Sequence, residues 1–287
     1  MLNRVGFGLV PVAHKRKTRL GLSGVWMSIM ANANTQAFTR LFKETAHYHH
    51  RYEVFRDFVS MAGIAIQNAI LKSDELEQEY LAIVGRYEKD DVARMGRLLA
   101  EVVMGLEASP CDFLGSVFME LELGSNHLSQ FFTPFCVSQL MSEILYSDVV
   151  DRLSGKPFIT AHEPASGSGG MIISLVKTMY NKGLNPQKQL WVSCVDVDAV
   201  AAMMAYVQLS LLHIPAEVVT GNSLTMKFAR VMRTPAHYLG LWDSKLSRHW
   251  SNDETQNAII IEDAPTAAPQ PMVAIYKGQM SLFDVYA

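Results

Sequence analysis

The stretch Glu163-Pro164-Ala165-Ser166-Gly167-Ser168-Gly169-Gly170 decides the fold, because it joins a short apolar run to a helical pattern. Phe158 and Ile159 precede it, and apolar residues recur after it at helical spacing, at Met171, Ile172, Leu175, Val176 and Met179. The stretch therefore predicts a strand, a glycine-rich turn and a helix. Three glycines in four positions allow a ligand to approach the backbone, and a helix N-terminus offers unpaired N–H groups. A tight turn without a ligand is the alternative interpretation.

The turn matches neither of the two common phosphate-binding patterns. No Lys follows the glycines, which excludes G-x-x-x-x-G-K-[ST], and the spacing is not G-x-G-x-x-G, which disfavours a nicotinamide cofactor. An acidic residue, Glu163, closes the expected strand. That position suits a cofactor with a cationic or hydrogen-bond-donating end.

Strands and helices are expected to alternate from Phe158 onward. Helices are expected at 170–182 and 198–213, and strands at 158–162, 190–196, 216–220, 228–233 and 258–261. This alternation predicts a parallel sheet covered by helices on both faces. Ligands of such sheets bind at the carboxyl ends of the strands, where Glu163 and Asp196 are expected to lie.

Three segments in this order resemble the N6-adenine DNA methyltransferases, specifically the modification subunit of type I restriction systems. The segment Gln130-Phe131-Phe132-Thr133-Pro134 matches the family's Q-F-[FY]-T-P. The 163–170 turn matches [DE]-P-x-x-G-[ST]-G-G. The segment Val195-Asp196-Val197-Asp198 matches the acidic residue that closes the second strand. The segment Asp112-Phe113-Leu114-Gly115 is similar to the family's approach to the first motif. The resemblance covers residues 80 to 240, approximately.

This resemblance implies a truncated Rossmann-like α/β fold that uses S-adenosyl-L-methionine. Glu163 would lie near the charged methionine end, and Asp196 would accept the ribose hydroxyls, with Asp198 less favoured for that role. An N-cap for the next helix is the alternative role of Asp196. The resemblance assigns these residues to the cofactor: Gln130, Phe132, Thr133, Pro134, Glu163, Pro164, Gly167, Gly169, Gly170, Asp196 and Asn222.

The chain departs from the family pattern after the third expected strand. Asn222 stands where the family has an Asp near the adenine; it can hydrogen-bond but carries no charge. The catalytic pattern [ND]-P-P-[FY], which holds the target amine and stacks on a flipped base, reads Thr234-Pro235-Ala236-His237. Thr234, Pro235 and His237 are therefore the candidate catalytic residues of a degenerate motif. The alternative is that 228–241 is only a strand and a loop.

Four parts of the chain are expected. Residues 1–34 form a disordered extension or precede the true start, with a basic DNA-contacting arm at 14–17 as the alternative. Apolar stripes at helical spacing predict a helical domain over 35–120, followed by the methyltransferase-like α/β domain over 121–263. Residues 264–287 form a proline-rich linker and a C-terminal peptide tail.

Composition limits the partners and the location. The net charge of −3 lacks a strongly basic footprint, so DNA contacts would come from local patches or from a partner. Cys111, Cys136 and Cys194 lack metal spacing and predict reduced thiols in the cytoplasm, and no apolar run is long enough to span a membrane. His47 and His50 have helical metal spacing but no further ligand, so a solvated helix face is preferred and no metal is expected.

The tail carries a second motif. Gln279-Met280-Ser281-Leu282-Phe283 resembles the short peptide that docks on the bacterial sliding clamp, in which Gln279, Leu282 and Phe283 would make the contacts. The alternative is that the tail packs on this chain's own core.

Two functions follow from these patterns. The first is an adenine-specific DNA methyltransferase that binds S-adenosyl-L-methionine and DNA, with a restriction–modification specificity subunit as a further partner. The second is a catalytically inactive methyltransferase fold that modulates restriction or replication through protein contacts, including the sliding clamp.

Overall fold

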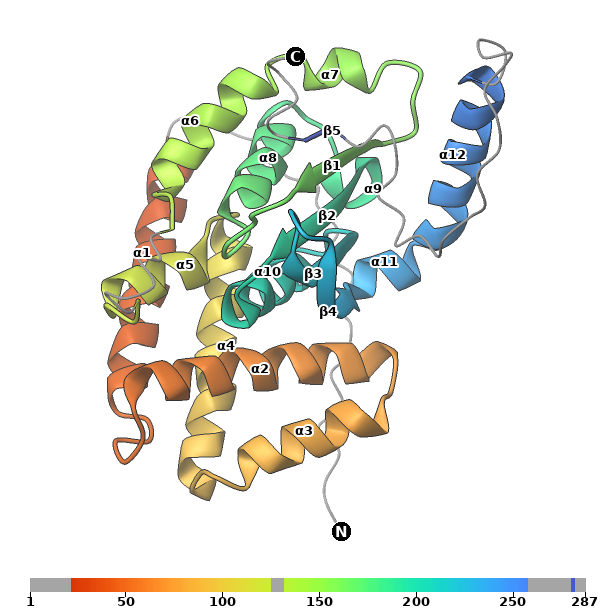
Figure 1. Ribbon diagram of the computed structural model, residues 1–287. Coiled ribbons are helices and arrows are strands. Elements are labelled where there is room, and N and C mark those ends of the chain that lie inside the picture. Colours follow the sequence, from red (N-terminus) through yellow and green to blue (C-terminus); the bar gives the residue numbers. More distant parts are fainter. Residues whose placement is uncertain (1–21, 125–131, 258–279, 282–287) are drawn as a thin grey trace.

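The computed structural model describes residues 22–124, 132–257 and 280–281. Its N-terminal part is helical, as predicted, and its helices appear in Figure 1 from red to yellow-green: α1 (Leu22–Lys43), α2 (Arg51–Ile70), α3 (Asp74–Val84), α4 (Lys89–Ala108) and α5 (Phe113–Glu120). Helix α1 begins at Leu22, inside the segment 1–34 that was expected to be a disordered extension or to precede the true start.

The rest of the described chain forms an α/β sheet with its flanking helices. The helices are α6 (Phe135–Leu145), α7 (Val149–Arg152), α8 (Gly170–Asn181), α9 (Pro186–Gln189), α10 (Ala199–Leu211), α11 (Pro235–Leu239) and α12 (Trp242–Asn257). The strands are β1 (Ile159–Glu163), β2 (Leu190–Asp196), β3 (Ala216–Asn222), β4 (Lys227–Arg233) and β5 (Met280–Ser281), in the spatial order β4-β3-β2-β1-β5. Together the helical region and the sheet confirm the predicted Rossmann-like fold class.

The prediction of a wholly parallel sheet was wrong at β4. This strand runs antiparallel to β3, with Arg233 opposite Glu217, whereas β1, β2, β3 and β5 run parallel to one another. Only residues 223–226 separate β3 from β4, too few for the crossover of a dozen or more residues that a parallel neighbour needs. The chain therefore leaves β4 at the amino ends of the parallel strands.

Strand β5 lies outside the expected strands. Met280 and Ser281 are registered with Ala161 and His162 of β1. The strand expected at 258–261 and the whole proline-rich linker lie outside the described residues.

Helix α10 lies between the sheet and the N-terminal helices (Figure 1). All its residues from Val200 to Ser210 are buried, as a helix that is apolar on every side requires. One continuous apolar core runs through it, from Phe38 and Phe58 in the N-terminal helices to Val192 and Val218 in the sheet. The apolar core is therefore continuous across residue 120, where a boundary between a helical domain and an α/β domain was expected.

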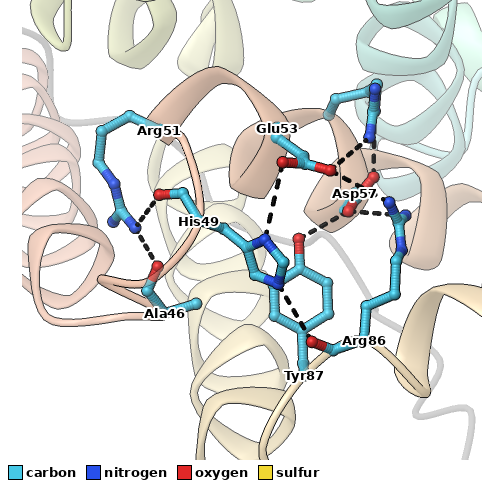
Figure 2. A network of polar contacts seen from close by, with 8 residues as sticks. Ala46, His49, Arg51, Glu53, Asp57, Arg86 and Tyr87 are labelled. Carbon is cyan, nitrogen blue, oxygen red and sulfur yellow. Dashed lines mark hydrogen bonds and ion pairs between the residues drawn. The ribbon is translucent and has the colours of Figure 1, made fainter.

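A polar network joins the α1–α2 connection to α2 and to the α3–α4 connection (Figure 2). The Arg51 guanidinium donates to the backbone oxygens of Phe42, Thr45, Ala46 and His49, and so caps the carboxyl end of α1. Asp57 accepts from the Tyr87 hydroxyl at 2.6 Å and pairs with Arg86 at 2.7 Å. Residues 47–50 thus belong to a connection and not to the expected helix face, and the described residues contain no cluster suited to a metal.

Within the described ranges, no helix combines the length and the apolar character that crossing a membrane requires.

Candidate functional site

Two carboxylates meet at the carboxyl edge of the sheet. Glu163 is the last residue of β1 and Asp196 is the last residue of β2, and these two strands are parallel neighbours. The strand order therefore brings both acids to the same edge, where the sequence places them. Asn222 ends the next strand, β3, at this edge.

The glycine-rich loop is bonded directly to the end of β2. The backbone N–H of Gly167 donates to Oδ2 of Asp196 at 2.7 Å, and that of Ser166 donates to the Val195 oxygen at 2.9 Å. Gly167 and Gly169 have φ angles of +53° and +91°, which side-chain-bearing residues rarely adopt. The loop ends at the first turn of α8, whose N-terminus faces this region.

Asp196 and Asp198 have different roles. Asp198 caps α10, because its Oδ1 accepts from the N–H groups of Val200 at 2.6 Å and Ala201 at 3.1 Å. Asp196 accepts from Gly167 and, through Oδ1, from the Asp198 N–H at 2.9 Å. The N-cap alternative considered for Asp196 therefore belongs to Asp198.

Burial makes both acids reluctant to ionise. Glu163 is 5% exposed, and burial, followed by the nearby charge of Asp196, raises its pKa to about 7. Burial also raises the pKa of Asp196, although its backbone hydrogen bonds oppose the shift. A ligand with a positive charge would relieve this repulsion, and hydroxyl groups could use the remaining carboxylate lone pairs.

An aromatic ring covers the loop on one side. A Cβ atom added at Gly167 would come within 3.0 Å of the Phe132 ring, which itself packs edge-on against Phe118 at 5.3 Å. Glycine at 167 therefore leaves the space that a side chain would take from this ring. Thr133 and Pro134 are exposed just before α6, and Gln130 lies outside the described residues.

The structure gives Asn222 a local role. Its Oδ1 accepts from the N–H groups of Leu224 at 2.9 Å and Thr225 at 3.0 Å, which closes the turn between β3 and β4. The oxygen expected near the adenine is thus already engaged within its own turn.

The structure does not bring the predicted catalytic residues to this edge. Thr234, Pro235 and His237 follow the antiparallel strand β4 and lie at the amino end of β3. Strand β3 extends from Ala216 to Asn222, which at ~3.3 Å per residue separates its two ends by roughly 20 Å.

These residues belong to a buried framework. Thr234 is fully buried; its hydroxyl donates to the Ile214 oxygen at 2.7 Å and accepts from the Ala216 N–H at 2.9 Å. The Trp191 indole N–H donates to Nδ1 of His237 at 3.0 Å, and Nε2 of His237 lies 3.2 Å from Asp243. Burial lowers the pKa of His237, which favours a neutral ring.

Three residues at the loop received no individual role from the sequence. They are Asp112 at the start of α5, Ser168 within the loop and Gln208 in α10, and they are joined by hydrogen bonds. Gln208 was detectable, because it is the one amide in the otherwise largely apolar run 199–211. A buried amide needs buried partners.

Comparison with known proteins gives a family match and similarities to several solved structures, two of which follow. The family model described as N-6 DNA Methylase matches residues 121–270. A class I S-adenosylmethionine-dependent methyltransferase from Listeria monocytogenes is 17% identical with a TM-score of 0.39, over 67% of this chain and 55% of that one. A type I restriction-modification methyltransferase subunit from Streptococcus thermophilus is 14% identical with a TM-score of 0.36, over 65% and 57%. No curated protein sequence matches the chain.

Proposed function

The chain belongs to the N-6 DNA methylase family, and we propose that Glu163, Asp196 and the 163–170 loop bind S-adenosyl-L-methionine. The family match contains all of these residues. In this proposal the Glu163 carboxylate receives the ammonium of the methionine end, and Asp196 receives the ribose hydroxyls. Gly167, Gly169 and Gly170 admit the ligand, with Pro164 in the turn and the Phe132–Pro134 segment beside it.

One observation carries this proposal. The hydrogen bond from Gly167 to Asp196 makes the loop and the acid of the second strand a single unit. The two carboxylates fit the ligand, because Glu163 could accept hydrogen bonds from an ammonium and Asp196 could accept them from a diol. When it is bound, S-adenosyl-L-methionine supplies an electrophilic methyl group on a sulfonium. This chain's residues would bind and orient it.

Asp196→Asn is expected to weaken S-adenosyl-L-methionine binding by about 10- to 100-fold, the effect of losing hydrogen bonds to a charged group. Isothermal titration calorimetry measures the dissociation constant. The control is Asp148→Asn, which changes a carboxylate that is paired with Arg152 on the exposed α7 segment. Equal affinity in wild type and Asp196→Asn, or no wild-type binding at millimolar cofactor, would refute the proposed site.

We further propose DNA as the macromolecular partner, with a restriction–modification specificity subunit supplying target recognition. The chain spans 55% and 57% of the two solved structures that it resembles, so methylation of adenine by this chain is itself a proposal. The degenerate motif at Thr234, Pro235 and His237 does not support it, because these residues lie away from the carboxylate edge. A cytoplasmic location is part of the proposal, since all three cysteines are unpaired.

A second candidate function is a non-catalytic interaction protein. Helix α6 turns small polar residues, Ser138 and Ser142, toward the interior, where Ser142 contacts Thr178 of α8. Its outer face is apolar and exposed at positions three and four apart, at Val137, Leu140, Met141 and Ile144. Contiguous exposed apolar side chains mark protein contact surfaces. This stripe favours a role through protein partners.

Clamp docking is a separate arm of this candidate. Gln279, Leu282 and Phe283 lie outside the described residues, whereas Met280 and Ser281 form β5 beside β1. Docking therefore requires β5 to leave the sheet. We expect purified sliding clamp to retain the full chain in a pull-down and to lose a Leu282→Ala/Phe283→Ala variant. A Val285→Ala variant serves as the matched control, and unchanged retention of the double variant would sink the clamp proposal.

A further inference from the structure

Asp112 is buried against the glycine-rich loop although it lies 51 residues before it in the chain, counted from Asp112 to Glu163. Its side chain is 3% exposed. Oδ2 accepts from the Ser168 hydroxyl at 2.5 Å, and Oδ1 accepts from the Gln208 amide at 2.9 Å and from the Gly115 N–H at 2.9 Å. One carboxylate thus joins helix α5, the loop and helix α10.

Two glycines make room for this carboxylate. A Cβ atom added at Gly115 would lie 2.1 Å from Oδ2 of Asp112 and 2.5 Å from the Ser168 hydroxyl. A Cβ atom at Gly170 would lie 3.0 Å from the same carboxylate oxygen. The chain therefore leaves side chains out at both positions around the contact between Asp112 and Ser168.

Gln208 completes the junction. Its amide also donates to the Ser168 backbone oxygen at 2.8 Å, and its own oxygen accepts from the Leu114 N–H at 3.0 Å. Gln208 is fully buried. Ser168 is therefore held at both its side chain and its backbone, by residues from two helices.

A helix cap alone does not account for this arrangement. Capping α5 requires only the bond from Gly115, and an exposed Ser, Thr or Asp would supply it without burying a charge. The groups that bond Asp112 are all neutral, and no ion pair among the described residues includes it. Burial without a counter-charge raises its pKa. A buried carboxylate that destabilises the fold is more readily retained where it orients another part of the molecule.

We propose that Asp112 is a positioning residue that holds the glycine-rich loop in its ligand-binding shape through Ser168. Ser168 lies between Gly167 and Gly169, which both have a left-handed backbone. Because glycine can adopt many backbone conformations, these two residues do not by themselves fix the shape of the loop. Asp196 holds one side of this segment at the Gly167 N–H, and Asp112 holds the other side. The cofactor readout below rests on the proposed function, whereas the loop readout does not.

The test compares Asp112→Asn with Asp91→Asn. Asp91 is a matched control: it is also 3% exposed, and it accepts from the Ala46 N–H, the Tyr48 hydroxyl and Arg94 in the N-terminal helices. Hydrogen exchange of the cofactor-free protein reads the Gly167 and Gly169 amides, which donate to Asp196 and to the Ser166 oxygen. Calorimetry reads S-adenosyl-L-methionine affinity.

Asp112→Asn is expected to speed exchange at 166–170 and to weaken cofactor binding, each about tenfold, relative to Asp91→Asn at equal loss of thermal stability. Ser168→Ala should reproduce both effects, and the double variant Asp112→Asn/Ser168→Ala should add little to either. If Asp112→Asn does not fold, Ser168→Ala alone decides. Unchanged loop exchange in Ser168→Ala, or equal loop effects in Asp112→Asn and Asp91→Asn, would overturn the positioning role. If the variants speed loop exchange as expected but the wild type does not bind the cofactor, only the proposed function is refuted and the positioning role stands.

Discussion

Glu163→Gln is expected to raise the free energy of unfolding at pH 8 and, at the same time, to weaken S-adenosyl-L-methionine binding. Burial and the neighbouring Asp196 raise the pKa of Glu163 to about 7, from 4.5 for the free side chain. At about 1.4 kcal/mol per pKa unit, the ionised carboxylate costs the folded state roughly 3 to 4 kcal/mol, and Gln removes this cost. Such a trade-off is typical of binding sites, where a residue that binds the ligand destabilises the free protein.

The sign of the pH dependence follows from proton binding. Between the unfolded and the folded pKa, the native state binds more protons than the unfolded state, so the wild type loses stability as pH rises from 4.5 to about 7. The stability advantage of Glu163→Gln should therefore be small below pH 4.5 and complete above pH 7. Binding of a cation needs the ionised form, so wild-type affinity should fall about tenfold from pH 8 to pH 6.

Urea denaturation and calorimetry across this pH range measure both effects. Glu163→Gln should bind about 10- to 100-fold more weakly at pH 8, and its affinity should report only the cofactor's own titration. Glu143→Gln on the exposed face of α6 is the control. A less stable Glu163→Gln protein, or one with undiminished affinity, would contradict the assigned role of Glu163.

Restoring the family's tetrapeptide is expected to damage the protein without creating activity. The triple variant Thr234→Asn/Ala236→Pro/His237→Phe removes the hydroxyl that bonds Ile214 and Ala216, and it removes the acceptor of the Trp191 N–H. Buried groups left without partners cost about 1 to 3 kcal/mol each, so the variant should lose about 3 to 5 kcal/mol. It should not methylate DNA, because residues 234–237 follow an antiparallel strand and lie far from the carboxylate edge.

The measurements are urea denaturation and transfer of a labelled methyl group to DNA. Ala236→Pro alone is the control, since this position follows Pro235 in the first turn of α11, where Pro is tolerated. Methylation of adenine by the triple variant, absent from the wild type, would show that residues 234–237 reach the cofactor after all.

The fold class and much of the site were predictable because they depend on local patterns. The turn 163–170 and the buried run 190–196 become the predicted loop and strand, since glycines and a fully buried apolar segment leave few alternatives. Parallel neighbours then bring Glu163 and Asp196 to one edge by geometry alone. The family match over residues 121–270 agrees with the resemblance that these motifs carry.

The direction of β4 was not predicted, and it places Thr234–His237 at the amino end of β3, away from the carboxylate edge. Matching Thr234–His237 to the family's motif assumed a parallel strand, whereas the short connection 223–226 already favours a hairpin. The contact between Asp112 and Ser168 was beyond sequence reasoning for another reason. It joins residues far apart in the chain, and only the packing of α5 and α10 against the loop brings them together.

The central claim is that the glycine-rich loop at the carboxyl edge of the sheet binds S-adenosyl-L-methionine. The most direct test is a titration of the cofactor into protein labelled with ¹⁵N only at glycine, followed by amide NMR. We predict that the amide signals of Gly167, Gly169 and Gly170 shift together, while those of Gly155 and Gly183, which lie in turns outside the site, do not change. Unchanged amide signals of the loop glycines at saturating cofactor, or changes confined to other glycines, would contradict the claim.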